Sequence, residues 1–197
     1  MVGAGTLAQQ EAQMDLEGKL LVAMPGMSDP RFDHSVILVC AHSEDGAMGL
    51  IVNKPNRDLD FTALLDHLDI SHVPSGRDIR VHFGGPVERG RGFVLHSGQG
   101  MMGAGTMQVA GGFRMTATLD ILEALARGEG PDTALLALGY SGWGPGQLEA
   151  EILRNDWLIC DAAPDLVYAA DDSGKWRGAL RSMGIDPLTL SPVAGRA

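Results

Sequence analysis

The strand-like runs of this sequence come in clusters of two to four, and single helical segments separate the clusters. Residues 19–24, 35–41 and 47–52 form the first cluster, and the polar turn between the last two ends at Gly46. A turn of this kind between two β-branched runs predicts an antiparallel hairpin. Strict alternation of strands and helices would instead predict a parallel sheet. The pattern therefore predicts the α+β class, with a single domain, a mixed and largely antiparallel sheet, and about four helices.

Two further hairpins are expected in the middle of the chain. Residues 79–83 and 92–96 read as strands joined by a long loop over residues 84–91. Gly111 and Gly112 separate two shorter strand-like runs, and a glycine pair in this position favours a tight turn.

The C-terminal half adds three predicted strands. Residues 133–138 are continuously apolar and should form a buried strand that leads into a tight turn in the glycine-rich stretch 139–146. Residues 157–160 and 165–169 read as two more strands.

Four segments carry apolar residues at helical spacing. In residues 61–68 the apolar positions fall three and four apart, and Asp60 precedes them as a candidate N-cap. The second segment is residues 121–126, the third begins at Pro145 and ends near Asn155, and the last is residues 176–183. These segments give the four expected helices.

Length and hydropathy are consistent with one domain, since 197 residues with 45% hydrophobic content can bury a sizeable core. Residues 1–17 are expected to form a flexible N-terminal arm, and residues 18–197 the domain. No signal-peptide pattern occurs in the arm, and no apolar run approaches the roughly 20 residues that cross a bilayer. We therefore expect a cytoplasmic protein without membrane contact, in which Cys40 and Cys160 remain thiols.

The net charge of −10 argues against direct nucleic-acid binding, because an acidic surface repels phosphates. Arg77, Arg80, Arg89 and Arg91 form the one basic concentration, and acidic residues are interleaved with them. A solvated hairpin face explains this group adequately, since it has neither a helix-turn-helix pattern nor an aromatic ladder. The expected partner is therefore a protein or a small molecule.

Cys40 and His42 form a candidate thiol pair. They lie two residues apart on a predicted strand, so they should share a face, and an imidazolium there could stabilise a thiolate. Such a pair would make the chain a cysteine-dependent enzyme or a redox sensor. The alternative is an ordinary buried cysteine, because free cysteine behaves as a small hydrophobic residue.

The other motifs lack the neighbouring elements or partner residues that their chemistry requires. Residues 98–103 match the letters of a dinucleotide-binding motif, but a strand pattern follows them where a helix is required. Ser141 lies between a strand and a helix, as in a hydrolase nucleophile elbow, yet no histidine follows His96 to complete a triad. His82 and His96 would be neighbours in the second hairpin, but no third ligand stands at metal-site spacing. We expect no cofactor and no metal.

Several segments, taken together and in this order, resemble the YqgE/AlgH family of bacterial proteins. They are LVAMP at residues 21–25, SVILVCAH at 35–42, GAMGLIVNKP at 46–55, GGPV at 84–87, RGFVLH at 91–96, GQLE at 146–149 and NDWL at 155–158. The resemblance covers about residues 16–197. One departure is Arg196, which stands where the family tail has a histidine.

The resemblance implies a compact α+β fold with coiled sheets, and it brings no catalytic residues and no cofactor. The family name reflects a proposed transcriptional-regulator role in alginate production. Matching loop residues make up a candidate binding surface, because loop residues of this kind tend to serve binding. These residues are Pro25, Asp29, Phe32, Asn53, Lys54, Pro55, Gly84, Gly85, Pro86, Trp143 and Gln147. The first hypothesis is therefore a non-catalytic cytoplasmic binding or regulatory protein, and the alternative is a cysteine-dependent function of Cys40 with His42.

Overall fold

One curled sheet organises the part of the chain that this computed structural model describes, residues 14–73, 79–97 and 103–190. Its strands run in the order β6-β7-β5-β8-β3-β2-β1-β9, and β4 pairs with β8 beside this path. The strands are β1 (Lys19–Ala23), β2 (Val36–Ser43), β3 (Gly46–Ile51), β4 (Val81–Phe83), β5 (Val87–Ser97), β6 (Thr106–Val109), β7 (Phe113–Thr116), β8 (Ala134–Trp143) and β9 (Trp157–Asp161). The pairing of β4 with β8 is parallel and all the other strand pairs are antiparallel, so the predicted mixed, largely antiparallel sheet is confirmed.

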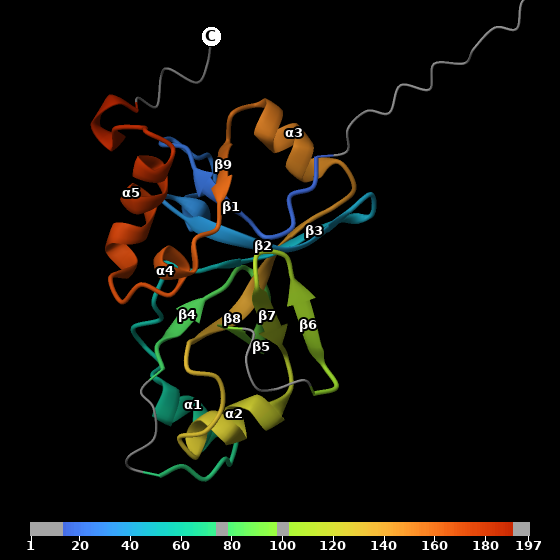
Figure 1. Cartoon of the computed structure of the whole chain (residues 1–197), viewed down its shortest axis with the longest axis vertical. Helices are drawn as coiled ribbons and strands as arrows, with labels where there is room; N and C mark the ends of the chain where they lie inside the picture. The colour runs from blue at the N-terminus through green and yellow to red at the C-terminus, as the bar shows by residue number, and fades with distance from the viewer. Residues whose placement is uncertain (1–13, 74–78, 98–102, 191–197) are drawn as a thin grey trace, which may run out of the picture.

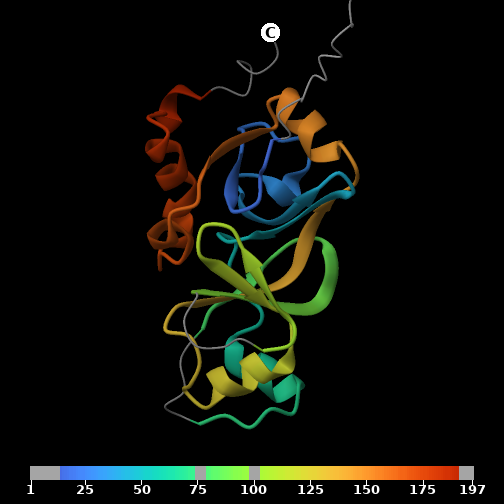
Figure 2. The ribbon, with the colours of Figure 1, turned by 45° about the vertical axis from the view of Figure 1, so that its right-hand side comes forward.

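The strand β8 joins the two halves of the sheet. Its first part pairs with β4 and β5, and its last part, Ser141 to Trp143, pairs with β3. In Figures 1 and 2, the strands β1, β2, β3 and β9 lie on one side of this joint and β4 to β7 lie on the other. The tight turn predicted for residues 139–146 is therefore wrong in its first half, because the strand continues to Trp143.

Glycine allows close backbone packing between β8 and the segment that precedes β5. A Cβ atom at Gly85 would fall inside the backbone of Tyr140, and one at Gly139 would lie 2.5 Å from the carbonyl oxygen of Gly85. Gly139 also has a φ of +71°, which favours glycine. The glycines that resemble turn signals in the sequence thus allow two backbone segments to approach each other within the sheet.

The predicted second hairpin is wrong. Instead of pairing with each other, β4 and β5 pair with opposite edges of β8, since Val81 is level with Leu136 on one side and Val94 with the same residue on the other. The expected loop over residues 84–91 is short, and β5 begins at Val87 with an irregular register up to Gly92. The first and third hairpins are confirmed, as β2 with β3 and β6 with β7.

The helices are α1 (Phe61–His67), α2 (Leu119–Ala126), α3 (Gln147–Leu153), α4 (Pro164–Val167) and α5 (Asp172–Ser182), with 3-10 turns at Pro30–Phe32 and Pro187–Thr189. The four predicted helices are confirmed, and the Asp60 side chain accepts a hydrogen bond from the backbone N–H of Ala63, as expected of an N-cap. The strand predicted at residues 165–169 is wrong. Pro164 instead presets the first turn of α4.

The core lies on both faces of the sheet. Alternate residues of β2 divide between two clusters, with Val36 and Leu38 in the central cluster between the sheet halves and Ile37 and Val39 in the cluster beneath α3. In Figure 1, α5 covers one flank of the central cluster, while α1 and α2 cover the far half of the sheet. Within the described ranges, no helix has the length and apolar character needed to span a membrane.

Candidate functional site

The strand β2 carries both members of the candidate thiol pair but places them in different surroundings. The register with β3 shifts between Val39 and Ala41, which marks a β-bulge at Cys40. Cys40 joins the central core, whereas the His42 Nε2 atom lies 2.7 Å from Oε1 of Glu149, just after the start of α3. The bulge breaks the alternation that would have kept the two side chains on one face.

Burial suppresses the reactivity of Cys40. The residue is 1% exposed, and its Sγ donates a weak hydrogen bond to the carbonyl of Leu38. Burial raises the pKa of this thiol to about 12, so the thiolate that acts as a nucleophile is scarce at neutral pH. His42 is engaged at both ring nitrogens, since Nδ1 also accepts a hydrogen bond of 3.4 Å from the backbone N–H of Leu16. The arrangement has no accessible thiol beside an imidazolium.

The structure brings the loops 53–55 and 84–86 together through their backbones. The N–H of Ile51 donates to the carbonyl of Gly84 at 3.0 Å, and the N–H of Phe83 donates to the carbonyl of Lys54 at 2.8 Å. Gly84 and Gly85 are buried against β8, and Pro86 is half-buried. These glycines are needed for the close approach of two segments, so they leave little surface for a ligand.

The predicted binding residues from Pro25 to Pro55 lie near the start of β2. The Asn53 side chain accepts from the N–H of Val36 and donates to the carbonyl of His34, which pins its loop to the start of β2. Burial lowers the pKa of Lys54, and the nearby carboxylates of Asp33 and Asp29 partly offset that effect. Asp29 also pairs with Arg31 at 2.6 Å. Phe32 packs edge-on against Trp157. Of the two prolines in this group, Pro25 is half-buried and Pro55 is exposed.

Trp143 and Gln147 lie at the opposite end of β3 and surround one carboxylate. The indole N–H groups of Trp143 and Trp157 both donate to Oε2 of Glu151, at 2.9 and 2.8 Å. The Gln147 amide donates to Oε1 of the same residue. Trp143 is more than nine-tenths buried and packs edge-on against Trp157, the same ring that Phe32 contacts.

The arginines of the basic concentration have separate contacts. Arg77 lies outside the described residues. The Arg80 guanidinium pairs with Asp172 at 2.7 Å, and those of Arg89 and Arg91 stack over phenylalanine rings. Most of the glycine-rich motif at residues 98–103 also lies outside the described ranges. Ser141 is a buried strand residue whose hydroxyl donates to the carbonyl of Gly84.

His82 and His96 lie on strands that β8 separates, so their predicted proximity is wrong. His96 contacts the hydroxyl of Thr116 at 2.8 Å and burial lowers its pKa. His82 contacts Asp172 at 3.1 Å. Across the described residues, no group of three or more His, Cys, Asp or Glu side chains could hold a metal ion.

A buried ionic cluster that the sequence reading missed anchors α5. The Lys175 ammonium, 1% exposed, donates to the carbonyl of Val52 and to Asp172, both at 2.8 Å. Asp172 also accepts from Arg80 and contacts His82. One sequence feature could have predicted this cluster: Asp172 and Lys175 are three residues apart beside the predicted helical segment that begins at Trp176, a spacing at which side chains on a helix pair.

An open cleft of about 670 Å³ with a largely apolar lining lies between the sheet halves. This volume falls within the range of ligand-binding pockets. Its walls come from the end of β2, from β3, β5 and β8, and from the β6–β7 hairpin. Among the predicted binding residues, Trp143 lines this cleft and the others lie outside it.

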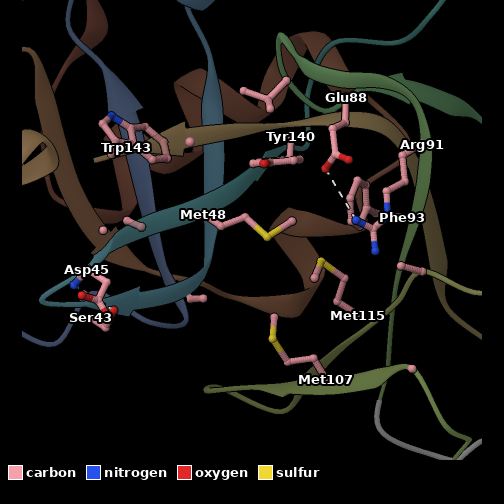
Figure 3. Close-up of a pocket in the computed structure, with 17 residues that line it drawn as sticks. Ser43, Asp45, Met48, Glu88, Arg91, Phe93, Met107, Met115, Tyr140 and Trp143 are labelled. Carbon is pink, nitrogen blue, oxygen red and sulfur yellow. Dashed lines mark hydrogen bonds and ion pairs between the residues drawn. The ribbon is translucent and has the colours of Figure 1, made fainter. Parts of the chain in front are cut away.

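Three methionines dominate the cleft. Met48 of β3, Met107 of β6 and Met115 of β7 point toward one another, as Figure 3 shows. Tyr140 and Phe93 continue the apolar wall and pack edge-on with ring centroids 5.8 Å apart. Methionine is unbranched and polarisable, so surfaces rich in it adapt to irregular apolar ligands.

Charged groups are confined to the two rims of the cleft. Glu88 and Arg91 form an ion pair of 3.5 Å on one rim, and the Arg91 guanidinium lies over the Phe93 ring. Ser43, the last residue of β2, and Asp45, in the turn that follows, stand on the other rim (Figure 3). An apolar centre with polar rims can bury an apolar group and orient its polar end.

Comparison with known proteins places the chain in a family. The DUF179 family model, described as AlgH-like, matches residues 20–188. A UPF0301 protein of Cereibacter sphaeroides is 67% identical over 184 residues, which are 93% of this chain and 100% of that protein. A UPF0301 protein of Ruegeria pomeroyi is 59% identical, again over 93% of this chain and 100% of its own length.

Solved structures agree with this fold. The AlgH protein of Pseudomonas aeruginosa, known from a solution structure, matches with a TM-score of 0.75 and 36% identity over 94% of each chain. A protein of Corynebacterium diphtheriae matches with a TM-score of 0.68 over 93% of each chain, and its 24% identity supports likeness of fold alone. None of these names states a ligand or a reaction. The chain belongs to the YqgE/AlgH family.

Proposed function

We propose that this protein is a non-catalytic binding protein that takes an apolar part of its partner into the methionine-lined cleft. The single observation that carries this proposal is the convergence of Met48, Met107 and Met115 on an open hollow of about 670 Å³. Removing an apolar group from water is favourable by about 25 cal/mol per Å². A cleft with such walls therefore gains affinity mainly from apolar contact.

The environment of the cysteines supports binding over turnover. Cys40 and Cys160 are both buried free thiols, and burial raises the pKa of each. A cytoplasmic location would keep them reduced. Substrate turnover that is lost on replacing Cys40 or His42 would contradict the proposal and favour a cysteine-dependent enzyme.

The regulatory role that the family resemblance implies fits the same proposal when it operates through a partner. The net charge of −10 disfavours contact with nucleic-acid phosphates. Two of the described arginines are paired with carboxylates, Arg80 with Asp172 and Arg91 with Glu88, which reduces the local positive charge. We infer regulation through a protein or small-molecule partner.

Titration with the neutral apolar dye Nile red tests the proposal. The double variant Met48→Gln/Met107→Gln keeps the size of both side chains and removes their apolar character, so it should weaken dye binding about tenfold. Leu153→Gln is the matched control, because Leu153 on α3 is 84% exposed and does not line the cleft. Equal dye affinity in the wild type and the double variant would overturn the proposal.

A further inference from the structure

A second hollow opens next to the methionine-lined cleft and is lined by carboxylates. It has a volume of about 600 Å³, and its acidic residues are Asp15, Glu17, Glu44 and Asp45. Ser43 and Asp45 line both hollows. The turn between β2 and β3 is therefore the shared rim of an apolar space and an acidic one.

The charge around the two hollows is strongly unbalanced. Their lining residues include the four carboxylates of the second hollow, Glu88, and a single guanidinium, that of Arg91. Arg91 is already paired with Glu88. His42 also lines the acidic hollow, but its Nε2 atom is engaged by Glu149. The carboxylates of the acidic hollow thus have no lysine or arginine among the residues that line it.

The nature of these carboxylates favours an external cation. Glu44 and Asp45 are exposed turn residues. Glu17 accepts from the backbone N–H of Ala110, and Asp15 accepts from the backbone N–H of Glu17, so both carboxyl groups are held in place by neutral donors. Carboxylates grouped in this way repel one another and attract a cationic group that can reach them.

We propose that the partner of the cleft is a protein segment that is apolar along one part and carries a cluster of lysine or arginine at its end. This inference rests on the proposed function of the methionine-lined cleft. The apolar side chains of the segment occupy the cleft, and its basic end crosses the shared rim at Asp45 into the acidic hollow. Charge complementarity at this rim fixes the direction in which the segment lies.

The same charges exclude other classes of macromolecule from this face. Nucleic-acid phosphates and anionic lipid headgroups would meet the carboxylates of the hollow, and like charges in contact oppose binding. Recognition of a basic, amphipathic segment by a methionine-rich surface is a known mode of peptide binding. The structure therefore points to a basic protein segment.

Fluorescence anisotropy with two synthetic peptides tests this inference. The first is a fluorescein-labelled, leucine-rich peptide that ends in a lysine cluster, and the second has glutamates in place of the lysines. At low salt the lysine peptide should bind at least about tenfold more tightly. That preference should shrink when the salt is raised to about 200 mM, because exposed charges are screened.

Two charge variants locate the effect. Asp15→Lys/Glu44→Lys reverses the charge of two residues that line the acidic hollow and not the cleft, so it should abolish the preference for the lysine peptide. Asp58→Lys/Glu123→Lys changes the net charge by the same amount at exposed residues that line neither hollow, and it should retain the preference. Nile red affinity should be the same in the wild type and in both charge variants.

The outcomes separate the two proposals. Equal affinity for the two peptides, or equal loss of preference in both charge variants, would overturn the basic-segment inference while normal Nile red binding leaves the cleft proposal standing. Nile red binding that survives Met48→Gln/Met107→Gln would overturn both.

Discussion

At the scale of single residues, the Cys40 thiol decides between binding and cysteine chemistry. Burial raises its pKa to about 12, so the thiolate is much scarcer at neutral pH than it is for an exposed cysteine. We predict that iodoacetamide modifies Cys40 in the native protein far more slowly than it modifies glutathione. Mass spectrometry of the labelled peptides measures the rate.

Unfolding in urea provides the control for this experiment, because it should restore ordinary reactivity to both cysteines. Rapid labelling of native Cys40 at neutral pH would contradict the binding account and revive the cysteine-dependent alternative.

The carboxyl of Asp172 should make stability depend on pH. Burial alone would raise its pKa, but hydrogen bonds from His82 and Lys175 outweigh burial and lower the pKa below the ordinary 3.8. Since the folded-state pKa is depressed, the stabilisation is complete above about pH 4 and is lost as the pH falls through the folded-state value. Asp172→Asn should cost about 3–5 kcal/mol at pH 7, because it leaves the Lys175 charge buried and unpaired.

Urea unfolding at pH 7 and pH 3 measures this effect. The gap in the free energy of unfolding between the wild type and Asp172→Asn should narrow at pH 3. Asp165→Asn is the matched control, since Asp165 is exposed and should change little at either pH. A gap that is equal at both pH values would contradict the assigned role of the carboxylate.

At the scale of elements, the approach of the 84–86 segment to β8 depends on glycine. A Cβ at Gly85 would collide with the backbone of Tyr140, and its φ is +155°. We predict that Gly85→Ala lowers the free energy of unfolding by about 3 kcal/mol. Gly90→Ala is the control, because a Cβ there meets no atom within 4 Å. Urea unfolding measures both, and equal stability of the two variants would contradict this packing role.

Local patterns predicted the elements whose causes are local. The turns at Gly46 and at Gly111-Gly112 set two hairpins, and Asp60 set the start of α1. β4 and β5 pair with opposite edges of β8, a strand far away in the sequence. Local turn residues carry no information about such long-range pairing. The extension of β8 to Trp143 was missed for a related reason, since glycine signals a turn and a close backbone approach in the same way.

At the scale of the whole molecule, the cleft depends on the curl of the sheet. The β6–β7 hairpin faces Met48 of β3 only because β8 joins the two halves at an angle. The predicted hairpin could place Met107 and Met115 on facing strands, but no spacing in the sequence relates them to Met48. For this reason the sequence predicted Trp143 as a binding residue on the cleft wall but did not predict the three methionines.

Methyl NMR of protein labelled with ¹³C-methyl methionine tests the cleft most directly, with Nile red as the added ligand. The binding account predicts that the methyl signals of Met48, Met107 and Met115 shift together as the dye is added, because these side chains line the cleft. The signals of Met24, Met27 and Met183, which do not line it, should stay in place. Shifts confined to those three distant methionines, or no shift at the cleft when dye binding is saturated, would contradict the account.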